Sequence, residues 1–351
     1  MTGRVRATRL TAAVEHLSAA GVGDREMRAR VLDVIQSFIP FDEYAFLLTD
    51  PTTSVGCSPV AEVPYLALLP DLIRLKYLTS VNRWTGLPAS GCAALVQATG
   101  GRLERSLLWR EHLSGLGIVD VVSVVFTDRF GCWGFLDLWR RESRFTDDEV
   151  AALVDVRPAI TSRLRGVQAA GFTAAEAAPD HRGPGALVLS PELTIRAQTA
   201  QTGDWLTALV PPQAGRSPVP ASAYNVAAQL LATEAGVDAH PAQARVHLGG
   251  GTWLTLRADR LGGPEPVAQR DIVVTMEASS PMERRDIFSR FHGLTGRETE
   301  VLRHVADGYD TRTVARLMSI SDLTVQDHLK SVFTKTCTSS RRELLAMSLG
   351  R

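Results

Sequence analysis

Residues 319–344 read SISDLTVQDHLKSVFTKTCTSSRREL, and they decide how the C-terminal part of the chain is interpreted. The stretch holds two of the three lysines in the sequence, Lys330 and Lys335. Apart from these three lysines, the positively charged residues of the chain are all arginine. Ser321 can cap a helix that begins directly after it. Apolar residues then recur at helical spacing and predict one buried face: Val325, Leu329, Val332 and Phe333.

Three further helices are predicted around this one. Thr295 and Glu298 form a capping box for the first, which Gly308 would end in the left-handed conformation. Asp310 starts a short second helix, and Ser340 caps a fourth. A short helix, a tight turn and a longer helix together make a helix-turn-helix arrangement.

The helix-turn-helix segment runs from Thr311 to Lys330, and the outer face of its longer helix is polar. Glutamine can pair with adenine, lysine can donate to guanine, and aspartate can accept from cytosine. Basic residues exceed acidic ones by four between 312 and 351, although the whole chain is neutral. Lys330 is placed to reach a base edge and Lys335 to reach a phosphate. The candidate DNA-contacting residues are Arg312, Thr324, Gln326, Asp327, Lys330, Lys335 and Arg341.

This segment resembles the C-terminal DNA-binding domain of LuxR-type transcription factors. The resemblance implies double-stranded DNA as partner and a homodimer, with RNA polymerase a further candidate partner. Cys337 stands where the family usually has glycine, and a non-glycine residue resists positive φ. The alternative is a helical bundle used only for packing or dimerisation. Matching positions include Leu294, Thr295, Arg297, Glu298, Val301, Leu302, Gly308, Thr324, Val325, His328, Leu329, Lys330, Lys335, Arg341, Glu343 and Leu344.

Residues 1–168 predict an α+β domain. The run GIVDVVSVVFTDRFGCWGFLDLWRR contains two β-rich segments joined by a hairpin loop. Helices are expected at about 4–20 and 25–39, and Thr146 with Glu149 caps a long helix after the hairpin. The architecture resembles a GAF domain.

A second α+β domain is predicted at 186–279, after a linker at 169–185 that reads AAGFTAAEAAPDHRGPG. Five short strand-like runs surround the helical YNVAAQLLATEAG and a loop, PPQAGRSPVP, and Trp205 lies on a helix. The pattern resembles a PAS-type domain. Ser280 caps a connecting helix at 280–291, and the DNA-binding domain covers 292–351. The predicted fold class is therefore two α+β sensory domains, GAF-like then PAS-like, followed by a small all-α four-helix helix-turn-helix domain.

Composition narrows the function classes. The four cysteines are far apart in the sequence, which argues against a disulfide framework or zinc site. No apolar run is long enough to cross a membrane, so a cytoplasmic protein with no membrane partner is expected. No histidines pair at ligand spacing, and no cofactor or metal is expected. Four tryptophans could line a pocket, although core packing is favoured: Trp84, Trp109, Trp133 and Trp139.

Enzymatic function finds no motif in its favour. Gly249–Gly251 lacks the lysine of a phosphate-binding loop, and Gly115–Gly117 lacks the third glycine of a dinucleotide fingerprint. The sequence therefore favours a non-enzymatic, DNA-binding transcription regulator, controlled through its N-terminal domains by an unidentified small-molecule effector or another signal. The alternative is a ligand-binding or scaffold protein whose C-terminal bundle mediates protein contacts only.

Overall fold

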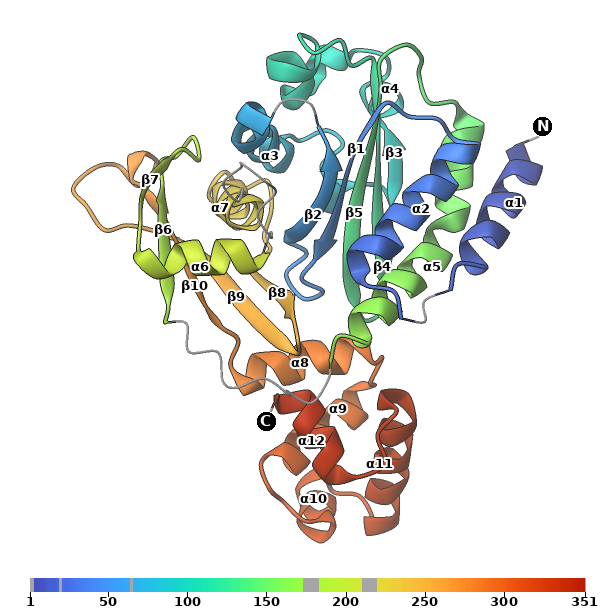
Figure 1. Cartoon of the computed structure of the whole chain (residues 1–351), viewed down its shortest axis with the longest axis vertical. Helices are drawn as coiled ribbons and strands as arrows, with labels where there is room; N and C mark the ends of the chain where they lie inside the picture. The colour runs from blue at the N-terminus through green and yellow to red at the C-terminus, as the bar shows by residue number, and fades with distance from the viewer. Residues whose placement is uncertain (1–2, 19–20, 64–65, 173–182, 210–219, 351) are drawn as a thin grey trace. The chain divides into compact units, whose positions relative to one another are not determined.

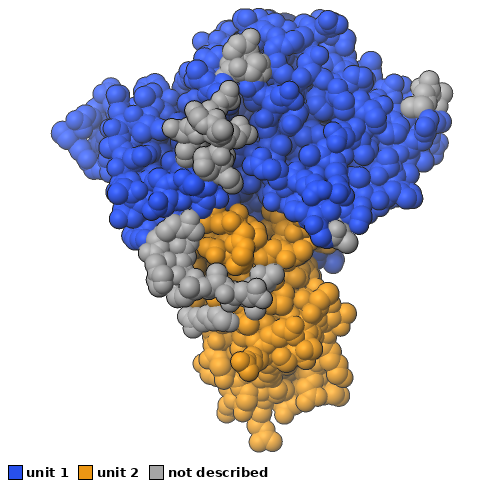
Figure 2. Space-filling view, viewed as in Figure 1, with its two compact units in different colours: residues 1–164, 182–246, 254–277 blue, residues 165–181, 247–253, 278–351 orange. Residues whose placement is uncertain are grey.

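The computed structural model describes residues 3–18, 21–63, 66–172, 183–209 and 220–350 (Figure 1). The chain divides into two compact units, shown in different colours in Figure 2. The first contains residues 1–164, 182–246 and 254–277, and the second contains residues 165–181, 247–253 and 278–351. Most of the predicted linker and nearly all of the loop PPQAGRSPVP lie outside the described residues.

The first unit begins with a five-stranded sheet of order β2-β1-β5-β4-β3. β5 is buried at almost every position because helices cover both faces of the sheet. The predicted hairpin joins β4 to β5, and the Asp128 carboxylate accepts from the backbone N–H of Phe130 at 2.8 Å in its turn. The strands are β1 (Glu43–Thr49), β2 (Gly56–Glu62), β3 (Cys92–Ala94), β4 (Asp120–Asp128) and β5 (Gly131–Arg140).

Figure 1 shows α2 and α5 along one face of this sheet and α3 on the other. The capping box that opens α5 is present, because Glu149 N donates to Thr146 Oγ1 and Thr146 N donates to Glu149 Oε2. The first helix ends at residue 15, earlier than expected. The helices are α1 (Gly3–Glu15), α2 (Asp24–Phe38), α3 (Leu69–Leu78), α4 (Leu95–Thr99) and α5 (Asp147–Ala169), with short turns of helix at Leu66–Leu68, Trp84–Gly86, Leu103–Arg105 and Trp109–Leu113.

A second five-stranded sheet has the order β7-β6-β10-β9-β8. When the strands of each sheet are numbered in chain order, both sheets have the same arrangement: second, first, fifth, fourth, third. Trp205 lies on a helix, as predicted, and the structure shows it fully buried. The elements are β6 (Gly185–Leu189), β7 (Ile195–Gln198), α6 (Ala200–Leu209), α7 (Ala221–Glu234), β8 (Gln243–Gly249), β9 (Thr252–Arg260), a short helical turn at Val267–Gln269 and β10 (Ile272–Ala278).

The helix α7 lies among the strands of the second sheet in the sequence but packs against elements of the first part of the chain. Its residues 221–229 are all buried, and the helix packs against α3 and β2 of the first sheet. A buried ion pair adds to this packing: Arg245 of β8 donates to Asp50 through Nε at 2.6 Å and Nη2 at 2.8 Å. The boundary that the sequence predicts between the two α+β segments stays a prediction. In the structure, most of both segments belongs to the same compact unit.

The second unit is mainly helical. It contains α8 (Pro281–Phe291), α9 (Gly296–Ala306), α10 (Thr311–Met318), α11 (Asp322–Thr336) and α12 (Arg341–Leu349). Each predicted capping residue accepts a hydrogen bond from the backbone three residues later, which confirms all five helix starts: Ser280, Thr295, Asp310, Ser321 and Ser340. The core between α9, α10 and α11 is formed by Val301, Val305, Val314, Ala315, Met318, Val325 and Leu329.

Arg284 anchors α8 within this unit. Its guanidinium donates to the carbonyl of Met347 through Nε at 3.2 Å and Nη2 at 3.0 Å, near the end of α12. It also donates to the carbonyl of Gly251 and lies 5.2 Å from the ring centre of Phe172. Phe172 in turn stacks on Trp253 at 4.8 Å. Aromatic packing and one buried arginine thus tie α8 to α12 and to residues 247–253.

Candidate DNA-binding surface

The turn between α10 and α11 sets the position of the longer helix. Ser319 adopts the left-handed conformation with φ 55° and ends α10. Ser321 then caps α11, because its side chain accepts from Thr324 N at 3.1 Å. The short helix, turn and longer helix that the sequence predicted are therefore present.

The outer face of α11 carries the side chains that the sequence placed there. Leu323 is 65% exposed. The side chains of Asp327 and Lys330 are 65% and 77% exposed, and their charged groups lie 3.9 Å apart. Gln326 is also exposed. Such an exposed ion pair contributes less than about 1 kcal/mol and can be exchanged for other partners at little cost. These groups are free to meet a ligand.

Of three other candidate residues, one is exposed and two form hydrogen bonds within the domain. Arg312 is exposed near the start of α10. The hydroxyl of Thr324 lies 2.8 Å from that of Ser321 and is thus engaged in the cap. Arg341 donates to Thr311 Oγ1 at 2.7 Å, so it holds the start of α10 to the start of α12. Arg316 was not predicted, although it is exposed four residues after Arg312 and so shares its helix face.

Lys335 has a partner that the sequence did not reveal. Its ammonium donates to the two carboxylate oxygens of Glu298 at 2.6 and 2.9 Å. Ser331 Oγ and Thr295 N donate to the same carboxylate, each at 2.6 Å. Burial alone would raise the pKa of Glu298, but these bonds, led by that from Lys335, lower it to about 2. The phosphate contact of Lys335 stays a prediction, and the residue has a structural role in addition.

Cys337 adopts the conformation in which glycine would be expected. It ends α11 with φ 53° and ψ 35°, in the left-handed region. The backbone N–H of Cys337 donates to the carbonyls of Phe333 and Thr334, so the turn forms without glycine. The geometry is retained at some cost in backbone strain.

The described residues contain no cluster of three or more His, Cys, Asp or Glu side chains that could hold a metal ion. No helix among them is long and apolar enough to span a membrane. Three of the four cysteines are buried, and burial raises the pKa of Cys92 to about 12 and of Cys132 to about 11. Thiols in that state are poor nucleophiles at neutral pH.

Comparison with known proteins assigns the C-terminal segment. Residues 292–348 match the family described as bacterial regulatory proteins, luxR family. The transcriptional regulatory protein DesR of Bacillus subtilis (strain 168) is 32% identical over 81 residues, which cover 23% of this chain and 41% of DesR. The C-terminal segment is therefore a LuxR-family helix-turn-helix domain, and proteins of that family are DNA-binding regulators and not enzymes.

One solved structure was compared over nearly the whole chain. The crystal structure of Escherichia coli SdiA has a TM-score of 0.35 and 13% identity, and the comparison covers 99% of this chain and 98% of SdiA. Similarity at this level does not establish a shared fold.

Proposed function

We propose that the protein is a sequence-specific transcription regulator that acts in the bacterial cytoplasm and inserts α11 into the major groove of double-stranded DNA. The observation that carries the proposal is the exposed, polar outer face of α11, on a helix whose other face is fixed in the core of a LuxR-family domain. Such a helix can present hydrogen-bonding groups to base edges in a fixed register.

The residues of α11 suit different parts of this task. Lys330 can donate to guanine and Gln326 can pair with adenine, each discriminating by about 1–3 kcal/mol. Asp327 opposes the phosphates electrostatically, so its use is discrimination, by accepting from the amino group of cytosine. Arg312 and Arg316, on the preceding helix, can contact phosphates and add affinity without sequence preference.

Control through the first unit is the second part of the proposal. The two sheets share one strand order and carry helices, which supports GAF-like and PAS-like sensory domains that respond to a small-molecule effector or another signal. Leu344 is fully buried whereas Leu345 and Leu349 are half-buried on α12. That helix can therefore pack partly inside the domain and partly across the two-fold axis of a homodimer, which would read paired half-sites about one helical turn apart. RNA polymerase is a further candidate partner.

Selection of bound sequences from random DNA by the full-length protein tests this function. We expect an enriched motif and an affinity that falls steeply with salt. Lys330→Ala should cost on the order of 1–3 kcal/mol on the selected site and relax the preference at one position. Arg303→Ala is the matched control, because Arg303 is exposed on α9 and should leave the preference unchanged. No enriched motif, or binding that ignores salt, would favour a scaffold protein whose bundle contacts only other proteins.

A further inference from the structure

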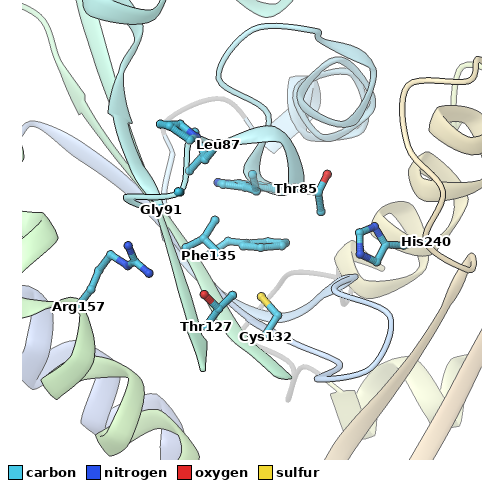
Figure 3. Close-up of a pocket in the computed structure, with 12 residues that line it drawn as sticks. Thr85, Leu87, Gly91, Thr127, Cys132, Phe135, Arg157 and His240 are labelled. Atoms are coloured by element: carbon cyan, nitrogen blue, oxygen red, sulfur yellow. The ribbon is translucent and has the colours of Figure 1, made fainter. Parts of the chain in front are cut away.

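A cavity of about 240 Å³ lies in the first unit, beside the ends of β4 and β5 (Figure 3). Its volume equals the share of roughly eight liquid water molecules, so it suits a small organic molecule. Its walls come from the loop 84–91, the two strands, α5 and the segment after α7. The residues that determine its chemistry are Trp84, Gly91, Phe135, Arg157 and His240.

One wall of the cavity is aromatic. Trp84 stacks on Phe135 with ring centroids 4.8 Å apart and planes at 10°. The indole N–H of Trp84 donates to Asp137 at 2.8 Å, and Asp137 pairs with the buried ammonium of Lys76 at 3.0 Å. Lys76 is itself held by Ser123 Oγ at 2.8 Å. Because this buried network fixes the indole, the aromatic wall is formed before any ligand arrives.

A cation without a counterion faces the cavity from α5, which covers the opposite face of the sheet. Figure 3 shows Arg157 pointing toward Gly91 and Phe135. The fit is close, since a Cβ on Gly91 would lie 2.5 Å from the guanidinium carbon. Arg157 Nε is buried and donates to no partner among the described residues, and burial of the guanidinium, with no carboxylate beside it, lowers its pKa. The buried Nε–H is the group left without a partner, and an anion bound in the cavity could accept from it.

The negative charge beside the far wall, that of Asp238, is already paired with neighbouring groups. His240, which lines this wall, has its Nδ1 2.6 Å from one oxygen of Asp238. Thr85 Oγ1 donates to the other oxygen, and Arg83 Nε lies 3.6 Å from it. The hydrogen bond to Asp238 raises the pKa of His240. Asp238 is thus occupied by its neighbours, whereas Arg157 lines the cavity without an anionic partner among the described residues.

We propose that this cavity binds a small aromatic carboxylate, with its ring against Trp84 and Phe135 and its carboxylate on Arg157. A planar guanidinium matches a carboxylate in a two-bond, charge-assisted arrangement. This inference names a class of effector for the sensory role proposed above. Binding of the acid does not depend on that role, but its regulatory meaning does. Since α5 continues past residue 164 into residues of the second unit, a ligand that holds Arg157 acts on a helix that both units share.

The test uses the full-length protein and three probe acids, benzoate, salicylate and phenylacetate, with their neutral amides as isosteres. Titration calorimetry reports binding, and the intrinsic tryptophan fluorescence, to which Trp84 contributes, gives a second signal. We expect at least one acid to bind, and we expect its amide to bind at least about tenfold more weakly. Arg157→Gln should weaken that acid by about ten- to a hundredfold and leave the amide unchanged. Arg157→Lys keeps the positive charge but not the planar guanidinium, so it should weaken binding of the acid less than Arg157→Gln does.

Arg129→Gln is the matched control, because it removes the same charge from an exposed arginine of the β4–β5 turn, which does not line the cavity. The proposal is overturned if no acid binds, if acids and amides bind equally, or if Arg129→Gln weakens binding as much as Arg157→Gln. DNA selection with the same protein separates the two proposals. If the protein selects a DNA motif but binds no acid, only the proposed ligand class is wrong. If it binds an acid but selects no motif, the proposed function is wrong and the proposed binding site is retained.

Discussion

Replacing Lys335 by alanine should destabilise the C-terminal domain more than it changes the choice of DNA sequence. Lys335 neutralises Glu298, whose side chain is 6% exposed. The pKa of Glu298 is about 2 against an ordinary value of 4.5, and each unit corresponds to about 1.4 kcal/mol. After the cost of burying it is subtracted, the ionised carboxylate therefore stabilises the fold by at most about 3.5 kcal/mol. Lys335 is the leading donor and is about one-third exposed, so we expect its loss to cost about 2 kcal/mol.

The pH dependence of this loss has a definite sign. A carboxyl whose pKa is lowered by folding contributes its full stabilisation above the pKa of the unfolded chain, and the contribution disappears as the pH falls through the folded pKa. The difference in unfolding free energy between wild type and Lys335→Ala should therefore be full at pH 7. It should shrink below about pH 4.5 and vanish near pH 2.

Hydrogen exchange of the full-length protein, read by mass spectrometry on peptides of α9 and α11, measures this local stability. A loss of about 2 kcal/mol corresponds to exchange roughly thirtyfold faster. Lys330→Ala is the control, because its side chain is 77% exposed and should leave exchange unchanged. The reasoning is refuted if Lys335→Ala leaves exchange unchanged but weakens binding equally on all DNA sequences and lowers the salt slope by about one. Lys335 would then act only as the phosphate contact predicted from the sequence.

Three further changes test other parts of the molecule. Asp327→Ala should strengthen binding to random DNA and narrow the gap to the selected site, measured by competition titration; unchanged values on both would mean that Asp327 faces solvent in the complex. Asp50→Ala leaves Arg245 buried without its anion and should lower the unfolding free energy of the first unit by about 3 kcal/mol in urea, whereas a loss below about 1 kcal/mol would contradict the burial of the pair. Cys337→Gly should stabilise the C-terminal domain by about 0.5–1 kcal/mol in thermal unfolding by relieving positive φ, and a destabilised variant would mean that the turn carries no strain.

Features fixed by neighbouring residues could be predicted from the sequence. A capping side chain bonds to a backbone N–H only three residues away, so Thr295 and Ser321 mark helix starts without knowledge of the rest of the chain. The outward face of α11 follows in the same way, because helical periodicity separates Lys330 from Leu329. The β4–β5 hairpin and the five strands of the second sheet were predicted for the same reason, since their alternation and turn residues are local, whereas β2 and β3 were not predicted.

Features that join distant residues could not be predicted. Glu298 satisfies the capping pattern completely, so nothing in the sequence indicates that Lys335, 37 positions later, is also its partner. The pair of Asp50 and Arg245 spans 195 positions. The tryptophans show a related limit: Trp139 packs in the core as expected, but Trp84 is both buried and part of a cavity wall, which depends on its stacking with Phe135.

The burial of α7 has a consequence for synthesis. The first sheet and its helices are complete once α5 has been made, but α7, which packs against α3 and β2, begins about fifty residues later. At ribosomal rates of about 5–20 residues per second, the nascent chain waits roughly three to ten seconds with that surface uncovered. During this interval the surface of α3 and β2 is open to chaperones and to other nascent chains. A fragment that stops before α7 would keep the surface exposed permanently, and we expect it to aggregate where the full chain stays in solution.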